Sequence, residues 1–179
     1  MIRKDSNYKR QIFAMNIVLI GMPGTGKSMI GKKLAKNLNH DFIDIDTLIK
    51  RKTKMGLQDY IDKYGDEAFI KIEEETVLNL NIENSIIAPG GSIIYSEKAI
   101  NHLKKNSFII FLDISLEALK YQVKNIDNRG IVYLRKKSYE ELYNERHSQY
   151  QRYADITLKI NNLTTEQVIK RIKRIYTRY

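Results

Sequence analysis

The chain has 179 residues, a length that suits one domain with a sizeable hydrophobic core. Cysteine is absent, which excludes disulfides, thiolate metal sites and cysteine nucleophiles. The excess of 31 Lys and Arg over 21 Asp and Glu gives a net charge of +10 and favours anionic partners.

The apolar segments are too short for a membrane helix. The longest uninterrupted aliphatic and aromatic run spans residues 108–112, whereas a membrane helix needs about 20 residues. Residues 11–22 are mostly apolar after a basic start, but Asn16 interrupts them and no small-residue cleavage pattern follows, so we do not interpret them as a signal peptide. We expect a soluble, cytoplasmic monomer with a basic extension at residues 1–15 and a single domain at residues 16–179.

The positive charge does not by itself predict nucleic-acid binding. Much of it lies at the two ends of the chain, where the simplest interpretation is a solvated tail and a solvated helix face. No nucleic-acid-binding module is recognisable, and the basic residues do not alternate with aromatic residues on one face. We therefore do not expect nucleic acid as a partner.

Strand-like and helix-like segments alternate along the chain. Short apolar runs predict buried strands at residues 16–20, about 42–44, 85–88, 107–112 and about 156–160. Amphipathic segments lie between these runs. In a single domain this alternation predicts an α/β fold, a three-layer sandwich in which helices cover both faces of a parallel sheet. Ligands of such sheets bind at the carboxyl ends of the strands.

Two helices can be located by their apolar spacing. Ile30, Leu34 and Leu38 lie four residues apart within residues 27–38, and the last segment of the chain repeats an apolar stripe. Two later helix starts carry capping boxes, in which a hydroxyl side chain and a residue three positions later satisfy each other's backbone amides. These pairs are Ser138 with Glu141 and Thr164 with Gln167.

Residues 21–28 read Gly-Met-Pro-Gly-Thr-Gly-Lys-Ser and match the phosphate-loop pattern G-x-x-x-x-G-K-[ST] between a predicted strand and a predicted helix. The glycines let backbone amides turn toward phosphate oxygens, and the helix that starts near Lys27 points its positive end at them. Lys27 is expected to reach the transferred group and Ser28 to hold Mg²⁺. GTPases, ATPases and small-molecule kinases share this loop, so it predicts a nucleotide and leaves the reaction open.

Two carboxylates accompany the next predicted strand. Residues 42–46 alternate apolar and acidic side chains, so we expect Asp44 and Asp46 to project from one face of an extended segment. One carboxylate can orient Mg²⁺ through water while the other positions a hydroxyl for in-line attack. The alternative is that two exposed aspartates simply end a strand.

Further motifs recur in a fixed order after the phosphate loop. They are Phe42-x-Asp44-x-Asp46, Gly65-Asp66-Glu67-x-Phe69, Gly90-Gly91, Arg129 in a polar insert, and Arg146-x-x-x-Tyr150-x-x-x-Ala154-Asp155. From about Asn16 to the C-terminus, the pattern resembles the shikimate kinase family. The resemblance implies a five-stranded parallel sheet with strand order 2-3-1-4-5, a mobile lid at about residues 125–137, and ATP and Mg²⁺ as cofactors. It also implies transfer of a phosphoryl group to a hydroxyl of shikimate, a small hydroxy acid.

The resemblance further implies roles for single residues. Those expected to bind the nucleotide are Gly24, Thr25, Gly26, Lys27, Ser28, Met29 and Arg129. Those expected to serve the metal are Ser28 and Asp44, and those expected to be catalytic are Lys27, Asp46 and Arg129. Those expected to contact the acceptor are Asp46, Gly90, Gly91 and Arg146. Asp113, which follows the apolar run at residues 108–112, is expected to be structural.

The departures from the family pattern concentrate near the predicted acceptor site. Ile70 stands where the family has an arginine that grips the acceptor carboxylate, although Glu73, the partner of that arginine, remains. Lys71 is adjacent but is turned by about 100° on a helix, so either another cation takes over or the acceptor differs. Ser92 replaces a family glycine and Gly130 a lid proline. The alternatives are a kinase for another hydroxy acid or polyol, and a non-catalytic nucleotide-binding module.

Overall fold

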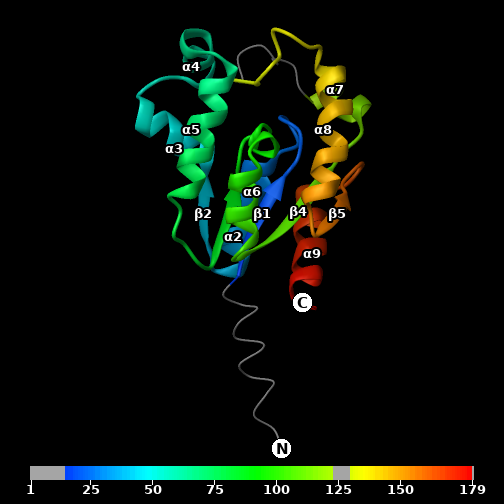
Figure 1. Cartoon of the computed structure of the whole chain (residues 1–179). Coiled ribbons are helices and arrows are strands. Elements are labelled where there is room, and N and C mark those ends of the chain that lie inside the picture. Colours follow the sequence, from blue (N-terminus) through cyan, green and yellow to red (C-terminus); the bar gives the residue numbers. More distant parts are fainter. Residues whose placement is uncertain (1–14, 123–129, 179) are drawn as a thin grey trace, which may run out of the picture.

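The computed structural model describes residues 15–122 and 130–178 (Figure 1). Five parallel strands form one sheet in the order β2-β3-β1-β4-β5. The strands are β1 (Asn16–Ile20), β2 (Asp41–Asp44), β3 (Ser85–Ala88), β4 (Ser107–Asp113) and β5 (Ile156–Lys159). The predicted parallel sheet and its strand order are confirmed.

Helices lie on both faces of this sheet, so the domain has the predicted three layers of helices, sheet and helices (Figure 1). They are α2 (Lys27–Leu38), α3 (Ile45–Thr53), α4 (Leu57–Tyr64), α5 (Asp66–Leu78), the 3₁₀ turn η1 (Ile93–Tyr95), α6 (Glu97–Lys104), α7 (Leu116–Gln122), α8 (Tyr139–Tyr153) and α9 (Thr165–Tyr176). Helices α2 and α9 pack against each other, whereas α5, α6 and α8 are joined through contacts of α5 with α6, and of α6 and α8 with η1 and β4. Within the described residues, none of these helices combines the length and the apolar character needed to cross a membrane.

The central strand explains why the sequence shows continuous apolar runs. All five residues of β1 are buried, since β3 and β4 flank it and helices cover the sheet. Ile17 pairs with Ile86 of β3 and with Phe108 of β4. Strands that are buried on both faces of a parallel sheet carry apolar residues at consecutive positions. The core of the domain therefore lies on this sheet, and its carboxyl edge is free for a ligand.

Helix boundaries follow local signals in the sequence. α2 begins directly after Gly26, whose φ of 83° favours glycine, and it ends at Leu38, which is followed by Asn39 in the left-handed region as the C-cap. Both predicted capping boxes are present, at the start of α8 and at the start of α9. Each box satisfies two backbone amides that would otherwise lack partners.

The prediction that Asp44 and Asp46 share one face of an extended segment is wrong. Strand β2 ends at Asp44, and Ile45 already starts α3. The physical reason is the side chain of Asp44, whose Oδ1 accepts a hydrogen bond of 3.0 Å from the backbone amide of Thr47 and so caps the helix. Asp46 is therefore held in the first turn of α3.

The second half of the predicted lid packs onto the domain. Ile131 and Val132 are buried, and the amide of Tyr133 donates a hydrogen bond of 2.7 Å to Asp66 at the start of α5. In Figure 1 this segment starts beside α4, passes above the sheet and then descends into α8. Lid residues 125–129, including Arg129, and extension residues 1–14 lie outside the described residues.

Candidate active site

The phosphate loop connects β1 to α2 at the carboxyl edge of the sheet. Its shape is fixed internally, because Thr25 Oγ1 donates a hydrogen bond of 2.6 Å to the carbonyl of Met22, and Gly24 and Gly26 take positive φ angles. Lys27 Nζ donates to the carbonyls of Gly21 and Met22, at 2.8 and 3.0 Å. The ammonium group is thus folded over the loop, where phosphate oxygens of a nucleotide would sit.

Ser28 and Asp44 form a pair beside this loop. The hydroxyl of Ser28 donates a hydrogen bond of 2.6 Å to Oδ2 of Asp44. Among the residues that the structure describes, no three His, Cys, Asp or Glu side chains gather into a metal cage. A hydroxyl and one carboxylate suit Mg²⁺, which keeps several waters and takes phosphate oxygens rather than a complete set of protein ligands. The residues present therefore fit a magnesium nucleotide.

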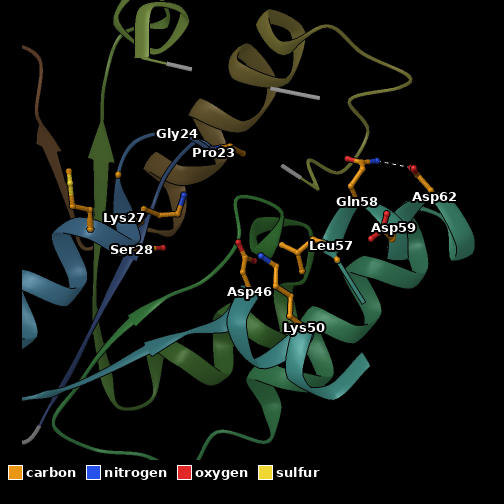
Figure 2. Close-up of a pocket in the computed structure, with 13 residues that line it drawn as sticks. Pro23, Gly24, Lys27, Ser28, Asp46, Lys50, Leu57, Gln58, Asp59 and Asp62 are labelled. Carbon is orange, nitrogen blue, oxygen red and sulfur yellow. Dashed lines mark hydrogen bonds between the residues drawn. The ribbon is translucent and has the colours of Figure 1, made fainter. Parts of the chain in front are cut away.

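A cavity of about 850 Å³ opens in front of the loop (Figure 2). Gly24, Gly26, Lys27, Ser28 and Met29 line one side of it. The opposite side comes from α3 and α4. The α3 and α4 residues that line it are Asp46, Lys50, Leu57, Gln58, Asp59 and Asp62. The loop and the predicted acceptor-binding aspartate thus share one cavity.

Asp46 also lies next to Gly90 and Glu73. A Cβ placed on Gly90 would lie 2.6 Å from Oε1 of Glu73 and 3.2 Å from Oδ1 of Asp46. Any side chain at position 90 would therefore collide with one carboxylate and crowd the other. The absence of a side chain there is what lets α3, α5 and the end of β3 meet at one point.

Electrostatic interactions connect the charged groups of this site. Burial raises the pKa of Asp46 to about 6, and the charge of Asp44 raises it further while Lys27 and Lys50 oppose the shift. Burial lowers the pKa of Lys27 to about 8 against the opposing charges of Asp46 and Glu73. At pH 7, Asp46 is mostly ionised and Lys27 mostly protonated, which suits a base beside a phosphate-binding cation.

Glu73 is more deeply buried than Asp46. Burial raises its pKa to about 7, whereas the hydrogen bond from Ser92 and the backbone amide of Gly90 lower it. Ser92 Oγ donates to Oε2 at 2.6 Å, and Oε1 has no partner of good geometry among the described residues. Glu73 is thus a buried carboxyl group at the inner end of the site, and its pKa of about 7 lies close to neutral pH.

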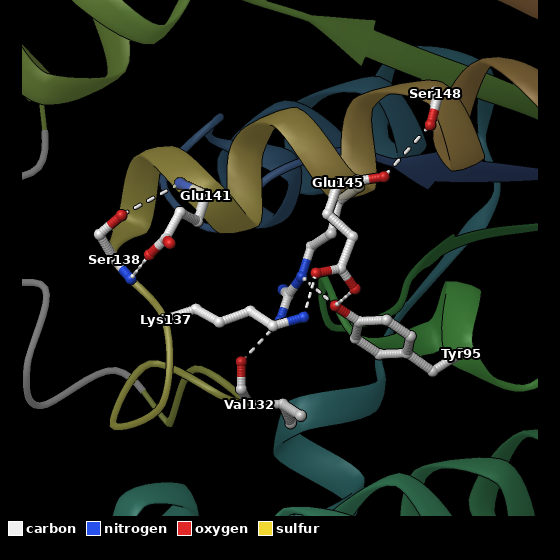
Figure 3. A network of polar contacts seen from close by, with 8 residues as sticks. Tyr95, Val132, Lys137, Ser138, Glu141, Glu145 and Ser148 are labelled. Atoms are coloured by element: carbon white, nitrogen blue, oxygen red, sulfur yellow. Dashed lines mark hydrogen bonds and ion pairs between the residues drawn. The ribbon is translucent and has the colours of Figure 1, made fainter.

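Arg146, the predicted ligand of the acceptor carboxylate, is fully buried on α8. Its Nη2 donates to the carbonyl of Val132 at 2.7 Å, and its Nε donates to the hydroxyl of Tyr95 at 3.1 Å. Glu145 accepts hydrogen bonds from Tyr95 and Lys137 in the same network (Figure 3). Arg146 interacts electrostatically with Lys27 and Glu73 but does not belong to the described lining of the cavity.

The remaining predicted positions are placed as follows. Gly91 lies against the phosphate loop, because a Cβ on it would be 2.8 Å from Pro23, and its carbonyl accepts a hydrogen bond of 2.6 Å from Tyr150. Met29 is exposed at the cavity wall. Asp113, expected to be structural, accepts a hydrogen bond of 2.9 Å from His147 and so ties β4 to α8. Arg129 lies outside the described residues.

Sequence reasoning missed Lys50 as a wall of the cavity and Ser92 as a partner of Glu73. The signal for Lys50 was its spacing of four residues from Asp46, which places both on one helical face once α3 is known. In the sequence, Ser92 is visible only as a replacement of a family glycine, and nothing in it indicates a contact with Glu73. Lys71, the residue next to Ile70, is exposed on α5 and is not among the residues that line the cavity.

The fold and the site together define a class. A parallel sheet of order 2-3-1-4-5, a phosphate loop with its lysine and serine, and an aspartate across the cavity are the parts of a P-loop phosphotransferase.

Comparison with known proteins identifies the family within this class. The shikimate kinase family model matches residues 23–177. The chain is 34% identical over 164 residues to the shikimate kinase of Caldanaerobacter subterraneus subsp. tengcongensis, covering 90% of this chain and 95% of the relative. It is 34% identical over 166 residues to that of Thermodesulfovibrio yellowstonii, covering 91% and 95%. The chain belongs to the shikimate kinase family, and it is a phosphotransferase that acts on a hydroxyl group.

Solved structures agree with this assignment. A shikimate kinase from Aquifex aeolicus has a TM-score of 0.73 and 28% identity, with 90% of this chain and 95% of that chain covered. The fold is also that of a shikimate kinase from Acinetobacter baumannii in complex with shikimate, with a TM-score of 0.82, 23% identity, and 93% and 96% coverage.

Proposed function

We propose that this chain transfers the γ-phosphoryl group of ATP to a hydroxyl of shikimate and yields shikimate 3-phosphate and ADP. The observation that carries this proposal is the shared cavity, which has Lys27 and Ser28 on one wall and Asp46 on the other. Membership of the shikimate kinase family supports the choice of acceptor. The proposal places the enzyme in the cytoplasm as a single subunit.

The residues that line the site have separate roles in the proposed reaction. The acceptor oxygen attacks the γ-phosphorus, the bond to the ADP oxygen breaks, and Asp46 accepts the proton of the hydroxyl. Lys27 turns from the loop carbonyls to the phosphates, since their charge is the stronger acceptor. Ser28 and Asp44 would hold Mg²⁺, which would supply positive charge to the phosphate oxygens. Arg129 is proposed to contact the transferred group, as the family resemblance implies.

The test is the release of ADP with and without shikimate, together with detection of the phosphorylated product. We expect release that depends on shikimate and that Asp46→Asn reduces by at least about 100-fold, in line with the loss of a general base. Asp41→Asn is the matched control, because Asp41 is an exposed carboxylate at the start of β2, the strand that precedes the helix of Asp46. Equal ADP release without any acceptor would identify an ATPase and contradict the proposal.

A further inference from the structure

A second cationic side chain shares the cavity with Lys27. Among the described residues that line it, only Lys27 and Lys50 are cations. Lys27 is engaged with the phosphate loop. Lys50 lies one helical turn after Asp46 on α3, and Figure 2 shows its side chain extending alongside that of Asp46. The two side chains therefore present a cation and a carboxylate to the same space.

Lys50 has no ion pair or side-chain hydrogen bond within the part of the chain that the structure describes. Its neighbour Lys52, in contrast, lies 3.4 Å from Glu75. The charge of Lys50 does act on Asp46, whose pKa it lowers. An exposed ammonium group that points into a cavity without a partner is available for an anionic ligand.

The other groups around the acceptor end leave little positive charge for an anion. Ile70 on α5 is apolar and partly buried, and Lys71 is exposed elsewhere on that helix. Arg146 is buried and its guanidinium is bonded to Val132 and Tyr95. Within the described part of the chain, the α4 wall adds two carboxylates and no cation: Asp62 is paired with Arg135 at 2.6 Å, and Asp59 adds a negative charge that opposes an anionic ligand.

We propose that Lys50 is the specificity-determining residue that binds the carboxylate of the acceptor while Asp46, one turn earlier, holds its reacting hydroxyl. This inference rests on the proposed function, because shikimate carries a carboxylate and ring hydroxyls on one small molecule. Residues four apart on a helix have side chains about 5–6 Å apart at Cβ, and the long lysine stem spans the width of such a ring. Lys50 thus performs from α3 the task for which α5 has no cation at position 70.

The test crosses two variants with two acceptors at pH 8, where Asp46 is ionised. The variants are Lys50→Met and the matched control Arg51→Met, which removes the same charge from a neighbouring exposed position of α3. The acceptors are shikimate and its carboxamide, in which a neutral amide replaces the carboxylate. We expect Lys50→Met to raise KM for shikimate by about 10- to 100-fold, the range for one charge-assisted hydrogen bond. We expect it to change KM for the carboxamide less than about threefold.

A third variant tests whether a cation from the facing helix can replace Lys50. Ile70→Arg should lower the shikimate KM of Lys50→Met by at least about tenfold, yet change that of the unaltered enzyme by less than about threefold. Calorimetric affinity for magnesium ATP should stay constant in all variants, which verifies their folding.

Two results would overturn the role of Lys50 and leave the proposed function standing. One is an equal rise of both KM values in Lys50→Met, which would indicate a structural effect or an effect on Asp46. The other is a shikimate KM that matches that of Arg51→Met. If the unaltered enzyme consumed ATP but phosphorylated neither acceptor, the proposed function itself would fail, and the role of Lys50 with it.

Discussion

The hydroxyl of Ser92 donates a hydrogen bond of 2.6 Å to Oε2 of Glu73, a carboxylate whose side chain is only 1% exposed. In the family pattern, position 92 is a glycine and the partner of this carboxylate is an arginine at position 70. This chain differs at both positions, with Ser92 and Ile70. A buried carboxylate without a partner is costly, so the serine hydroxyl provides a polar contact at the point where the cation is missing.

A hydroxyl compensates a buried charge less than a guanidinium does, and this predicts a pH-dependent stability. Burial raises the pKa of Glu73 from 4.5 to about 7. The folded chain binds this proton more tightly than the unfolded chain does, so the neutral carboxyl group contributes its full stabilisation below the unfolded pKa of about 4.5. That stabilisation is lost as the pH rises through the folded pKa of about 7. We expect Glu73→Gln to unfold like the unaltered chain at pH 4.5 but to be more stable at pH 8, by up to about 3 kcal/mol.

Urea denaturation at the two pH values measures this difference. Glu75→Gln is the control, because Glu75 is an exposed carboxylate on the same helix, paired with Lys52. Parallel stability curves for Glu73→Gln and the unaltered chain between pH 4.5 and pH 8 would show that Glu73 is not the titrating group.

Asp46 predicts a pH dependence of activity that is independent of stability. A general base acts only when it is ionised, and burial together with Asp44 raises the pKa of Asp46 to about 6. We expect kcat/KM for shikimate at saturating magnesium ATP to level off above pH 7 and to fall about tenfold for each pH unit well below 6. Since Lys50 lowers this pKa, Lys50→Met should move the acid limb to higher pH. A profile that is flat between pH 5 and pH 8 would contradict a titrating base.

The Ser28–Asp44 pair predicts that loss of the serine hydroxyl weakens ATP binding mainly when Mg²⁺ is present. The hydroxyl of Ser28 lies 2.6 Å from Asp44, and both are proposed to serve Mg²⁺. Ser28→Ala should weaken the binding of magnesium ATP by at least about tenfold while it changes metal-free ATP binding less than about threefold, because the loop amides and Lys27 remain. Calorimetry with and without Mg²⁺ compares the two. Equal losses in both titrations would assign Ser28 to the phosphates.

Much of the fold follows from signals that are local in sequence. Residues 16–20 and 27–38 have the observed bounds of β1 and α2, because a buried parallel strand is apolar throughout and because glycines set the turn between them. The two capping boxes fix helix starts in the same way. The phosphate loop needs only its own glycines, lysine and serine.

The acceptor end could not be predicted in the same way, since its geometry depends on contacts between distant segments. Whether Asp46 continues a strand or starts a helix is decided by the cap at Asp44, and the alternating pattern suits both. Ile131 and Val132 gave no periodic signal because they are buried by docking onto other elements rather than by helix packing. Ser92 becomes meaningful only when Glu73, 19 residues away, is placed beside it.

Gly130 begins the segment of residues 130–137, which packs against Leu57 of α4 and Asp66 of α5. The φ of Gly130 is 65°, whereas the proline of the family pattern is fixed near −65°. A Cβ at this position would also collide with Leu57 of α4. Gly130→Ala therefore combines a left-handed backbone cost of about 1–2 kcal/mol with a steric clash, and it should release residues 131–137 from α4 and α5 at least about ten times more often.

Limited trypsin digestion measures this release, because the chain becomes cleavable after Arg135, Lys136 and Lys137 when the segment separates from α4 and α5. Mass spectrometry assigns each cut to its position. Asp66→Ala removes the opposite anchor, the carboxylate that accepts from the amide of Tyr133 and pairs with Lys136 at 3.1 Å. Because both variants weaken the same docking, they should accelerate the same cuts. If Gly130→Ala left cleavage at residues 135–137 unchanged while Asp66→Ala accelerated it, the turn at Gly130 would have no part in holding the segment.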